Sequence, residues 1–457
     1  MLTKAATSEL SNLLGDRLSV SKSDLDAHGG SETHFAAAPP DAVAYPETTE
    51  EVSQLMKICH AHGVPVIGYG AGTSLEGHTS AIHGGLTVDF ARMNRVLEVN
   101  QGDMDAVVQP GITREALNRD LRATGLFFSV DPGANASLGG MAATRASGTT
   151  TVRYGTMREN VLGLEVVMAD GRVIRTGTRA RKNSAGYDLT SLFLGSEGTL
   201  GLITELSLRL HGQPEAVSSG ICAFERMEDA VEAVVAVIQM GLPMARIEFL
   251  DADAVRAVNA YSGTDVVEQP HLFVEFHGSD ASVAEDAARF GEIVADFGAS
   301  GVEVATKPEE RTALWTMRHH AYWACLGLKK GATAVVTDVC VPISALAQAV
   351  EETRADIADS IIEGPILGHV GDGNFHAILL VDPGQPAELD VAKSLAARMN
   401  ERALRLGGTV TGEHGIGIGK LAYMDAQHGH AWDVMSDIKM ALDPQGILNP
   451  GKLTKPR

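Results

Sequence analysis

Glycine is unevenly distributed along this chain, and its distribution limits the folds that the chain can adopt. Nearly half of the 49 glycines among the 457 residues lie between Gly63 and Gly201. Glycine weakens the interiors of helices and strands, but it allows the backbone to turn tightly and to approach other groups closely. This region therefore predicts short strands joined by tight turns, with backbone that lies directly against a ligand.

The length and composition describe a globular, acidic protein. At roughly 150 residues per domain, the length predicts about two or three domains. The 37 Lys+Arg and 58 Asp+Glu give a net charge of -21, which disfavours binding to nucleic acid or to an anionic membrane surface. An anionic substrate would therefore need a local positive site. The cysteines form no C-x-x-C pair, which argues against a zinc knuckle or a disulfide framework and fits a reducing compartment.

The N-terminal run MLTKAATSELSNLLGDRLSV is polar and amphipathic and lacks the apolar core of a signal peptide. No stretch of the chain approaches the roughly 18 apolar residues of a membrane span. We therefore expect no signal peptide, no transmembrane segment and a cytoplasmic location, either free or peripheral to a membrane.

The sequence pattern changes twice along the chain. Short helices are expected from 1 to about 60, and short valine-rich strands separated by glycine from 64 to 210, with one helix at TREALNRDLRATG. After 215, helical runs such as MEDAVEAVVAVIQMG alternate with strands such as HLFVEFHG, which indicates an α+β domain with an antiparallel sheet. The last thirty residues predict a helix and a tail rich in proline and glycine.

The run VPVIGYGAGTS predicts a strand followed by a turn that contains Gly68, Gly70 and Gly72. It is similar to the start of a Rossmann fingerprint, in which Asp89 would bind a ribose. Two observations exclude that motif: position 73 is Thr, and the following LEGHTSAIHGG has neither helical periodicity nor room for a crossover helix. The turn is then either a tight hairpin between two strands or a phosphate-binding turn.

Two further segments favour a ligand-binding function for this region. Small residues dominate the segment from Asp131 to Thr149, a composition that no packed helix or strand would choose for stability. The third segment, SLFLGSEGTLGLITELSLRL, places Glu197, Gly198 and Gly201 before a strand.

In this order and spacing, the three segments resemble the FAD-binding domain of the vanillyl-alcohol-oxidase superfamily, the PCMH type. The resemblance covers nearly the whole chain. It implies a two-part FAD-binding domain at 1–215, an α+β substrate or cap domain at 216–425, and a segment at 426–457 that packs back on the FAD domain. Some relatives carry a flavin-linking histidine at the position of Thr73, so non-covalent FAD is expected here. The implied FAD-binding residues are Gly70, Ala71, Gly72, Thr73, Ser74, Pro132, Gly133, Gly139, Gly140, Ala143, Ser147, Gly148, Glu197, Gly198, Ile203 and Asn449.

The stretch GHVGDGNFHAILLV contains two histidines beside a turn. Asp372 and Gly373 are typical of a two-residue hairpin loop, which would pair His369 with His376. Directly opposed residues have Cβ atoms roughly 4.5–5.5 Å apart, close enough for two imidazoles to bind one ion. The alternative is a pair of surface histidines without a ligand.

Downstream, the run TVTGEHGIGIGK contains adjacent Glu413 and His414. Neighbours in an extended chain point to opposite sides, so Glu413 could bind the ion while His414 faces an adjacent cavity. Two histidines and a carboxylate suit zinc, manganese or ferrous iron. The alternative is that Glu413 and His414 pair with each other or with solvent.

The runs RHHAYW, TDVCVPIS, GHVGDGNFH, TGEHGIGIGK and DPQGILNPGK resemble the flavin-dependent D-2-hydroxy-acid dehydrogenases, and within them the cytochrome-type branch that oxidises D-lactate. The resemblance assigns His369, His376 and Glu413 to a divalent metal, zinc or manganese, and His414 to catalysis. The chemistry is consistent with this assignment. A metal chelated by the carboxylate and hydroxyl of the acid acidifies the hydroxyl, a histidine takes its proton, and the C2 hydride moves to flavin N5.

Three further residues are expected to contact the substrate. The planar fork of Arg318 suits the substrate carboxylate, although WTMRHHAYW could equally form a solvated helix face. Tyr322, one helical turn later, is a candidate wall of the pocket, and Asn374 lies between the two histidines. His319 and His320 are expected to be structural.

The substrate preference rests on two apolar residues. In the 2-hydroxyglutarate branch, a lysine and an asparagine help to hold a distal carboxylate, and the matching positions here are Val336 and Ile378. A second buried carboxylate would lack partners, which favours D-lactate or a near homologue. Glycolate or D-2-hydroxyglutarate oxidation, a flavin-assisted transferase and a non-catalytic flavin scaffold are the alternatives. Transferase relatives are histidine-rich where this chain has Glu413. The expected electron acceptor is cytochrome c, a quinone or an electron-transfer flavoprotein, and the oligomeric state, a homodimer included, stays open.

Overall fold

The computed structural model describes residues 2–30, 33–305 and 307–455. They divide into two compact units. Unit 1 comprises the described parts of 1–147, 155–213 and 413–457, and unit 2 comprises those of 148–154 and 214–412. The chain thus enters unit 2 briefly at 148–154 and again at 214, and it returns to unit 1 at 413. From the sequence, boundaries were expected after 215 and after 425.

The N-terminal part of unit 1 contains a small four-stranded sheet of order β1-β2-β4-β3. Strands β2 and β3 both run parallel to β4. Parallel neighbours need a long connection, and residues 70–85 supply one that contains no helix. The hairpin interpretation of the glycine turn is therefore wrong, and the absence of a crossover helix is confirmed. The elements are α1 (Lys4–Leu14), β1 (Leu18–Ser19), α2 (Lys22–Gly29), β2 (Ala42–Ala44), α3 (Thr49–His62), β3 (Val66–Tyr69) and β4 (Leu86–Asp89).

A second sheet of unit 1 has five antiparallel strands in the order β5-β6-β10-β8-β9. The predicted strand run LEVVMADGRVI divides into two strands at a turn, in which Gly171 has a φ of +82°. The elements are β5 (Val96–Asn100), β6 (Asp105–Val108), α4 (Arg114–Asp120), β7 (Leu126–Phe127), α7 (Met157–Asn160), β8 (Val161–Val167), β9 (Val173–Gly177), α8 (Leu189–Phe193), β10 (Leu202–Arg209) and β11 (His211–Gly212).

Part of the segment of small residues forms a helix, contrary to the sequence-based expectation. Helix α5 (Leu138–Thr144) buries Leu138, Met141 and Ala142 in the core of unit 1. A Cβ on Gly139 would lie 2.5 Å from Cβ of Pro110. Glycine is needed there because the helix packs directly on neighbouring backbone, a long-range contact that composition alone does not reveal.

The C-terminal segment returns to unit 1. Helices α16 (Met424–His428) and α17 (His430–Leu442) precede a tail that lies beside β3. The N–H of Val66 donates to Ile447 O at 2.7 Å, and the N–H of Asn449 donates to Val66 O at 2.8 Å. The predicted return of the chain end to this part of the fold is confirmed.

Unit 2 is built on an eight-stranded antiparallel sheet of order β15-β12-β14-β13-β18-β19-β16, with β17 also paired to β19. The predicted α+β class and its antiparallel sheet are confirmed. The strands are β12 (Ala216–Ala223), β13 (Met244–Leu250), β14 (His271–Gly278), β15 (Glu303–Ala305), β16 (Thr333–Val336), β17 (Val339–Cys340), β18 (Ile366–Gly368) and β19 (Asn374–Val381).

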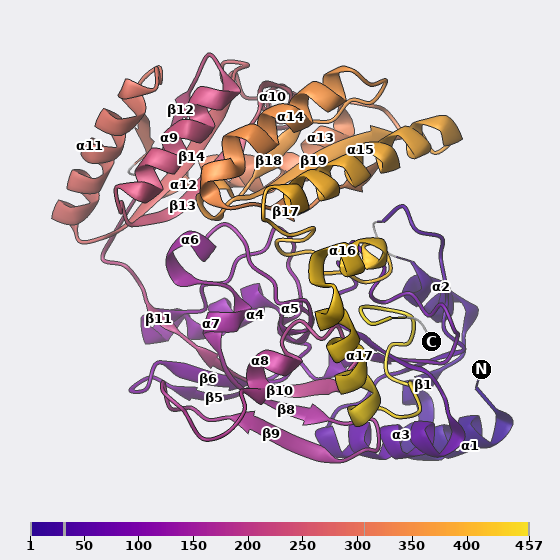
Figure 1. Ribbon diagram of the computed structural model, residues 1–457. Helices are drawn as coiled ribbons and strands as arrows, with labels where there is room; N and C mark the ends of the chain where they lie inside the picture. The colour runs from indigo at the N-terminus through magenta and orange to yellow at the C-terminus, as the bar shows by residue number, and fades with distance from the viewer. Residues whose placement is uncertain (1, 31–32, 306, 456–457) are drawn as a thin grey trace. The chain divides into compact units, whose positions relative to one another are not determined.

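Helices cover both faces of this sheet, and Figure 1 shows α9, α14 and α15 together over one of them. Alternate side chains of β19 point to the two faces of the sheet. Phe375, Ala377 and Leu379 join the core under those helices. The alternating Ile378 and Leu380 join the core under the opposite helix layer. The helices are α6 (Thr151–Tyr154), α9 (Met227–Gln239), α10 (Ala252–Ser262), α11 (Asp280–Asp296), α12 (Pro308–His319), α13 (Ala321–Gly327), α14 (Leu346–Ala358) and α15 (Pro386–Arg405).

Candidate active site

The turn after β3 fits a phosphate-bearing ligand such as FAD. A Cβ on Gly70 would lie 2.0 Å from Ser137 Oγ, and a Cβ on Gly72 would lie 2.2 Å from Tyr69 Oη. A side chain at either position would therefore require Ser137 or Tyr69 to move, and the φ of Gly72 is +70°. The Oγ of Ser74 is buried and has no hydrogen-bond partner among the described residues. A buried hydroxyl left unpaired is costly, so this turn suits phosphate oxygens.

Backbone hydrogen bonds bring the second and third predicted FAD segments together. The N–H of Gly195 donates to Ala142 O at 2.9 Å, and the N–H of Glu197 donates to Ala143 O at 2.8 Å. Helix α5 and the turn before β10 are therefore adjacent within unit 1. A Cβ on Gly133 would meet no atom within 4 Å. Of the other predicted FAD residues, Ala71, Thr73, Pro132, Gly139, Gly140, Ser147, Gly198 and Ile203 also belong to unit 1, whereas Gly148 belongs to unit 2.

The Glu197 carboxylate is committed to other parts of unit 1. It accepts hydrogen bonds from the N–H groups of Ile416 and Gly417 at 2.7 and 2.9 Å, and His78 Nε2 lies 3.3 Å away. Burial raises the pKa of Glu197, but His78 and these N–H groups outweigh burial and hold the pKa below its usual range. Asn449 Nδ2 donates to Glu197 O at 2.7 Å. Glu197 therefore fixes the loop that follows His414.

The two histidines of unit 2 meet, although the predicted turn is wrong. The register pairs Leu367, not His369, with His376, and a short 3-10 turn at Val370–Asp372 replaces the two-residue loop. Residues two apart on a strand point to the same face of the sheet, so a register shift of two residues keeps both histidines on one face. The rings of His369 and His376 accordingly lie 5.6 Å apart, centroid to centroid, with ligand nitrogens within 4.8 Å.

Both imidazoles are held through their Nδ1 atoms. His369 Nδ1 lies 2.8 Å from Glu248 Oε1, and His376 Nδ1 donates to Thr337 O at 3.0 Å. Metal-binding histidines in proteins are oriented in this way, with one ring nitrogen hydrogen-bonded to a carboxylate or carbonyl and the other directed at the metal. The pair therefore fits a divalent cation bound through Nε2.

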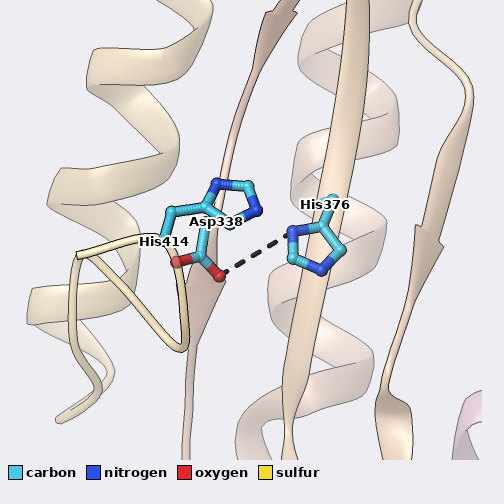
Figure 2. Close-up of side chains that lie close together, drawn as sticks. All are labelled: Asp338, His376 and His414. Carbon is cyan, nitrogen blue, oxygen red and sulfur yellow. Dashed lines mark ion pairs between the residues drawn. The ribbon is translucent and has the colours of Figure 1, made fainter. Parts of the chain in front are cut away.

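Asp338 is a buried carboxylate beside this pair that the sequence analysis missed. Figure 2 shows Asp338 next to His376, and 3.7 Å separates Oδ1 from Nδ1. The carboxylate accepts hydrogen bonds from Asn374 Nδ2 at 2.7 Å and Thr411 Oγ1 at 2.6 Å. A charged residue inside the apolar run AVVTDVCVP was a usable signal, because buried charges need partners. Asn374, predicted to contact substrate, keeps its buried Oδ1 without a partner among the described residues.

Arg318 is buried on α12 and does not form a solvated helix face. Its Nη2 donates to Glu248 Oε2 at 2.6 Å, and its Nε has no hydrogen-bond partner in the described part of the chain. Burial raises the pKa of Glu248, but the interactions with His369 and Arg318 outweigh burial and hold the pKa below its usual range. Glu248 was also missed, although alternating charges in the strand ARIEFLD could have indicated a polar half of the sheet face.

Glu413 and His414 open the C-terminal part of unit 1. Ser147 Oγ donates to Glu413 Oε2 at 2.9 Å. The preceding residues, Thr411 and Gly412, belong to unit 2, where Thr411 bonds Asp338. The chain thus passes from the surroundings of His376 to Glu413 within two peptide links.

The two apolar residues behind the substrate prediction are direct neighbours. Val336 on β16 pairs with Ile378 on β19, two residues beyond His376 on the same face. Both pack in the apolar core that also contains Trp315. Tyr322 belongs to this core as well, but α12 ends at His319 and α13 begins at Ala321, so no continuous helix joins Tyr322 to Arg318.

Comparison with known families gives two matches that together span most of the chain. Residues 40–177 match the family described as FAD binding domain. Residues 213–453 match the family described as FAD linked oxidases, C-terminal domain.

Individual proteins resemble the chain along nearly its whole length. A "Probable D-lactate dehydrogenase, mitochondrial" of Danio rerio is 48% identical, over 98% of this chain and 91% of the relative. A "D-lactate dehydrogenase [cytochrome], mitochondrial" of Arabidopsis thaliana is 42% identical, over 99% of this chain and 80% of the relative. The solved structure of p-cresol methylhydroxylase with substrate bound superposes with a TM-score of 0.80 at 17% identity, over 99% of this chain and 97% of the other. This likeness confirms the predicted PCMH-type fold.

The expected cytoplasmic location is wrong by comparison with these relatives, whose names place them in mitochondria. The expectation rested on the lack of a long apolar segment, a criterion that does not detect an amphipathic mitochondrial signal. In the part of the chain that the structure describes, no helix is long and apolar enough to cross a membrane.

Proposed function

We propose that this chain, which belongs to the family of FAD-linked oxidases, oxidises a D-2-hydroxy acid to the 2-oxo acid. The preferred substrate in this proposal is D-lactate. Family membership confirms the predicted resemblance, the FAD cofactor and the assignment as an FAD-dependent oxidoreductase. The substrate, the cation and the residue roles below are our proposals.

The proposed cation site consists of His369, His376 and Glu413. In support, both imidazoles are anchored at Nδ1, so Nε2 would be the ligand atom. A Cβ on Gly412 would lie 2.2 Å from Asn374 Nδ2, so Gly412 packs against the strand that carries His376. Glu413 follows directly, and consecutive Cα atoms are about 3.8 Å apart. Imidazole and carboxylate donors suit zinc or manganese.

Two residues of the chain would act on the substrate itself. The fork of Arg318 binds the carboxylate, for which it keeps an unpaired Nε–H. His414 accepts the proton of the C2 hydroxyl while the C2–H bond breaks. Bound FAD supplies the acceptor for the hydride, and a bound divalent cation supplies the positive charge that acidifies the hydroxyl.

The proposed choice of substrate rests on the Val336–Ile378 pair. We propose that these side chains, which continue the strand face of His376, form an apolar wall for the substrate, and no lysine or asparagine replaces them. A methyl group can pack against such a wall, whereas a second carboxylate would lose its hydration without gaining a partner. We therefore propose D-lactate rather than D-2-hydroxyglutarate.

Anaerobic bleaching of the bound flavin tests this proposal. D-lactate and D-2-hydroxybutyrate should bleach the flavin absorbance rapidly, D-2-hydroxyglutarate slowly, and L-lactate, the matched stereochemical control, not at all. Glycolate, which lacks the methyl group, measures what the apolar wall contributes. Failure of every D-2-hydroxy acid to bleach the flavin contradicts the function, and preference for D-2-hydroxyglutarate contradicts the substrate.

We further propose that a cytochrome accepts the electrons. The name of the Arabidopsis relative, which includes a cytochrome, supports this choice. Steady-state D-lactate oxidation with cytochrome c as the sole acceptor should proceed, and a quinone analogue and an electron-transfer flavoprotein serve as competing acceptors. If cytochrome c accepts no electrons while an artificial dye does, the acceptor is a different carrier.

A further inference from the structure

Glu248 lies between the two groups that would bind substrate and cation in unit 2. It is completely buried on β13. Its Oε1 and Oε2 lie 2.8 and 2.9 Å from His369 Nδ1, and Oε2 also accepts from Arg318 Nη2 at 2.6 Å. One carboxylate thus contacts a histidine of the proposed cation site and the arginine of the proposed carboxylate site.

Packing alone does not explain this carboxylate. Its strand neighbours Ile247 and Phe249 face the opposite apolar core, and Glu248 is paired across the sheet with Phe273. Burying a charged group in such surroundings is expensive unless it is paired and hydrogen-bonded. Stability would be served as well by an apolar residue together with an apolar replacement of Arg318.

We propose that Glu248 is a positioning residue that couples the cation site to the carboxylate site. It selects the His369 tautomer with the proton on Nδ1, which turns Nε2 toward His376. It also holds the Arg318 fork in one orientation. This role rests on the proposed function, because Arg318 matters only if the substrate carries a carboxylate.

The chemistry of a 2-hydroxy acid makes such coupling useful. Its carboxylate and its hydroxyl stand on adjacent carbons, so the groups that bind them must keep a fixed separation. Displacement of about 1 Å in a reacting geometry can cost roughly 100-fold in rate. A single carboxylate bonded to both groups fixes their separation with no intervening flexible side chain.

The test measures zinc affinity and substrate kinetics in Glu248→Gln. Its amide is neutral and presents an NH2 donor in place of one carboxylate oxygen, so the hydrogen bonds to His369 and Arg318 weaken together. We expect the zinc affinity of the FAD-loaded protein, measured without substrate by competition with a fluorescent chelator, to fall about 10- to 100-fold. At saturating zinc, KM for D-lactate should rise more than kcat falls, since Arg318 is then misoriented.

Glu275→Gln is the matched control. Glu275 is a buried carboxylate on the neighbouring strand β14, bonded to Trp315 Nε1 at 2.6 Å and Ser219 Oγ at 2.8 Å. Its loss perturbs a comparable polar network of the same sheet face without contacting His369. Zinc affinity should therefore stay within about twofold of the wild type, well short of the loss expected for a positioning partner.

The outcomes separate this inference from the proposed function. Wild-type zinc affinity in folded, FAD-bound Glu248→Gln overturns the positioning role, as does an equal loss in Glu275→Gln. If Glu248→Gln does not fold, Glu248→Asp provides the test, because its shorter side chain keeps the charge but does not extend to His369 and Arg318. Unchanged zinc affinity in Glu248→Asp overturns the positioning role. A fall in zinc affinity in a protein whose flavin no D-2-hydroxy acid bleaches upholds the positioning of His369 and refutes the proposed substrate.

Discussion

Replacing Glu197 by glutamine should loosen the loop that follows His414. The carboxylate accepts hydrogen bonds from the N–H groups of Ile416 and Gly417 at 2.7 and 2.9 Å. A hydrogen bond to a charged group contributes about 1.5–3 kcal/mol, and one between neutral groups about 0.5–1.5 kcal/mol. Neutralising the acceptor therefore costs roughly 1 kcal/mol per bond, about 2 kcal/mol in all. Because 1.4 kcal/mol corresponds to a factor of ten, local opening of the loop should increase about 30-fold.

Hydrogen exchange measured by mass spectrometry detects this opening directly. Peptides that contain the amides of Ile416 and Gly417 should exchange about 30-fold faster in Glu197→Gln than in the wild type. Glu205→Gln is the control, since its carboxylate bonds the exposed Arg175 at 3.1 Å and does not contact the loop. An acceleration below about threefold, or an equal one in the control, would refute the idea that this carboxylate fixes the loop.

The same carboxylate predicts a pH dependence with a definite sign. The pKa of Glu197 is held below its usual range in the folded protein, since its partners outweigh burial. A carboxyl group of this kind stabilises the folded state above its unfolded pKa of about 4.3, and the stabilisation is lost as pH falls through the folded-state pKa. Exchange protection of the loop should fall with acid more steeply in the wild type than in Glu197→Gln. Identical acid dependence would contradict this assignment.

The remaining predictions concern catalysis, specificity and stability. His414→Ala should slow flavin reduction by about 10²- to 10⁴-fold with FAD and metal content unchanged, whereas Glu413→Ala should lose metal and activity together, both measured by stopped-flow absorbance and metal analysis. Val336→Lys should raise the kcat/KM ratio of D-2-hydroxyglutarate to D-lactate by about tenfold or more, because a charge-assisted hydrogen bond contributes about 1.5–3 kcal/mol. Burial lowers the pKa of Lys452 to about 7, against a smaller opposing effect of Glu197. Since the unfolded chain then binds more protons, this group's contribution to stability should rise from about pH 7 to 10, and thermal denaturation of Lys452→Met should lack that rise.

The histidine pair shows why a partly wrong local prediction can still bring the two predicted residues together. The turn residues predicted a two-residue loop, and the structure has a short 3-10 turn with a register shifted by two residues. Side chains along a strand point to the same face every two residues, so this error leaves His369 and His376 on the same face of the sheet, as predicted. A shift of one residue would have separated them.

The residues that the sequence analysis missed are defined by long-range contacts. Glu248 is 121 residues from His369 in the sequence, and Asp338 is 73 residues from Thr411. Local pattern can show that a charge stands in an apolar strand, but it does not show which element packs against that charge. The same limit applies to Glu197, whose backbone context suggested a nucleotide site while its carboxylate bonds a loop more than 200 residues later in the chain.

The charge of Arg318 now has a different interpretation. An anionic substrate of this acidic protein was expected to need a local positive site, and Arg318 was expected to bind its carboxylate, but Glu248 at 2.6 Å compensates the guanidinium. In the proposed site, two neutral imidazoles and the Glu413 carboxylate would leave a divalent cation with a net charge of about +1. Attraction of the substrate carboxylate would then depend on the cation, and Arg318 would contribute orientation through its planar fork. Removal of the cation by a chelator should therefore weaken binding of the unreactive anion oxalate more than Arg318→Lys does, and the reverse order would show that Arg318 is the main source of attraction.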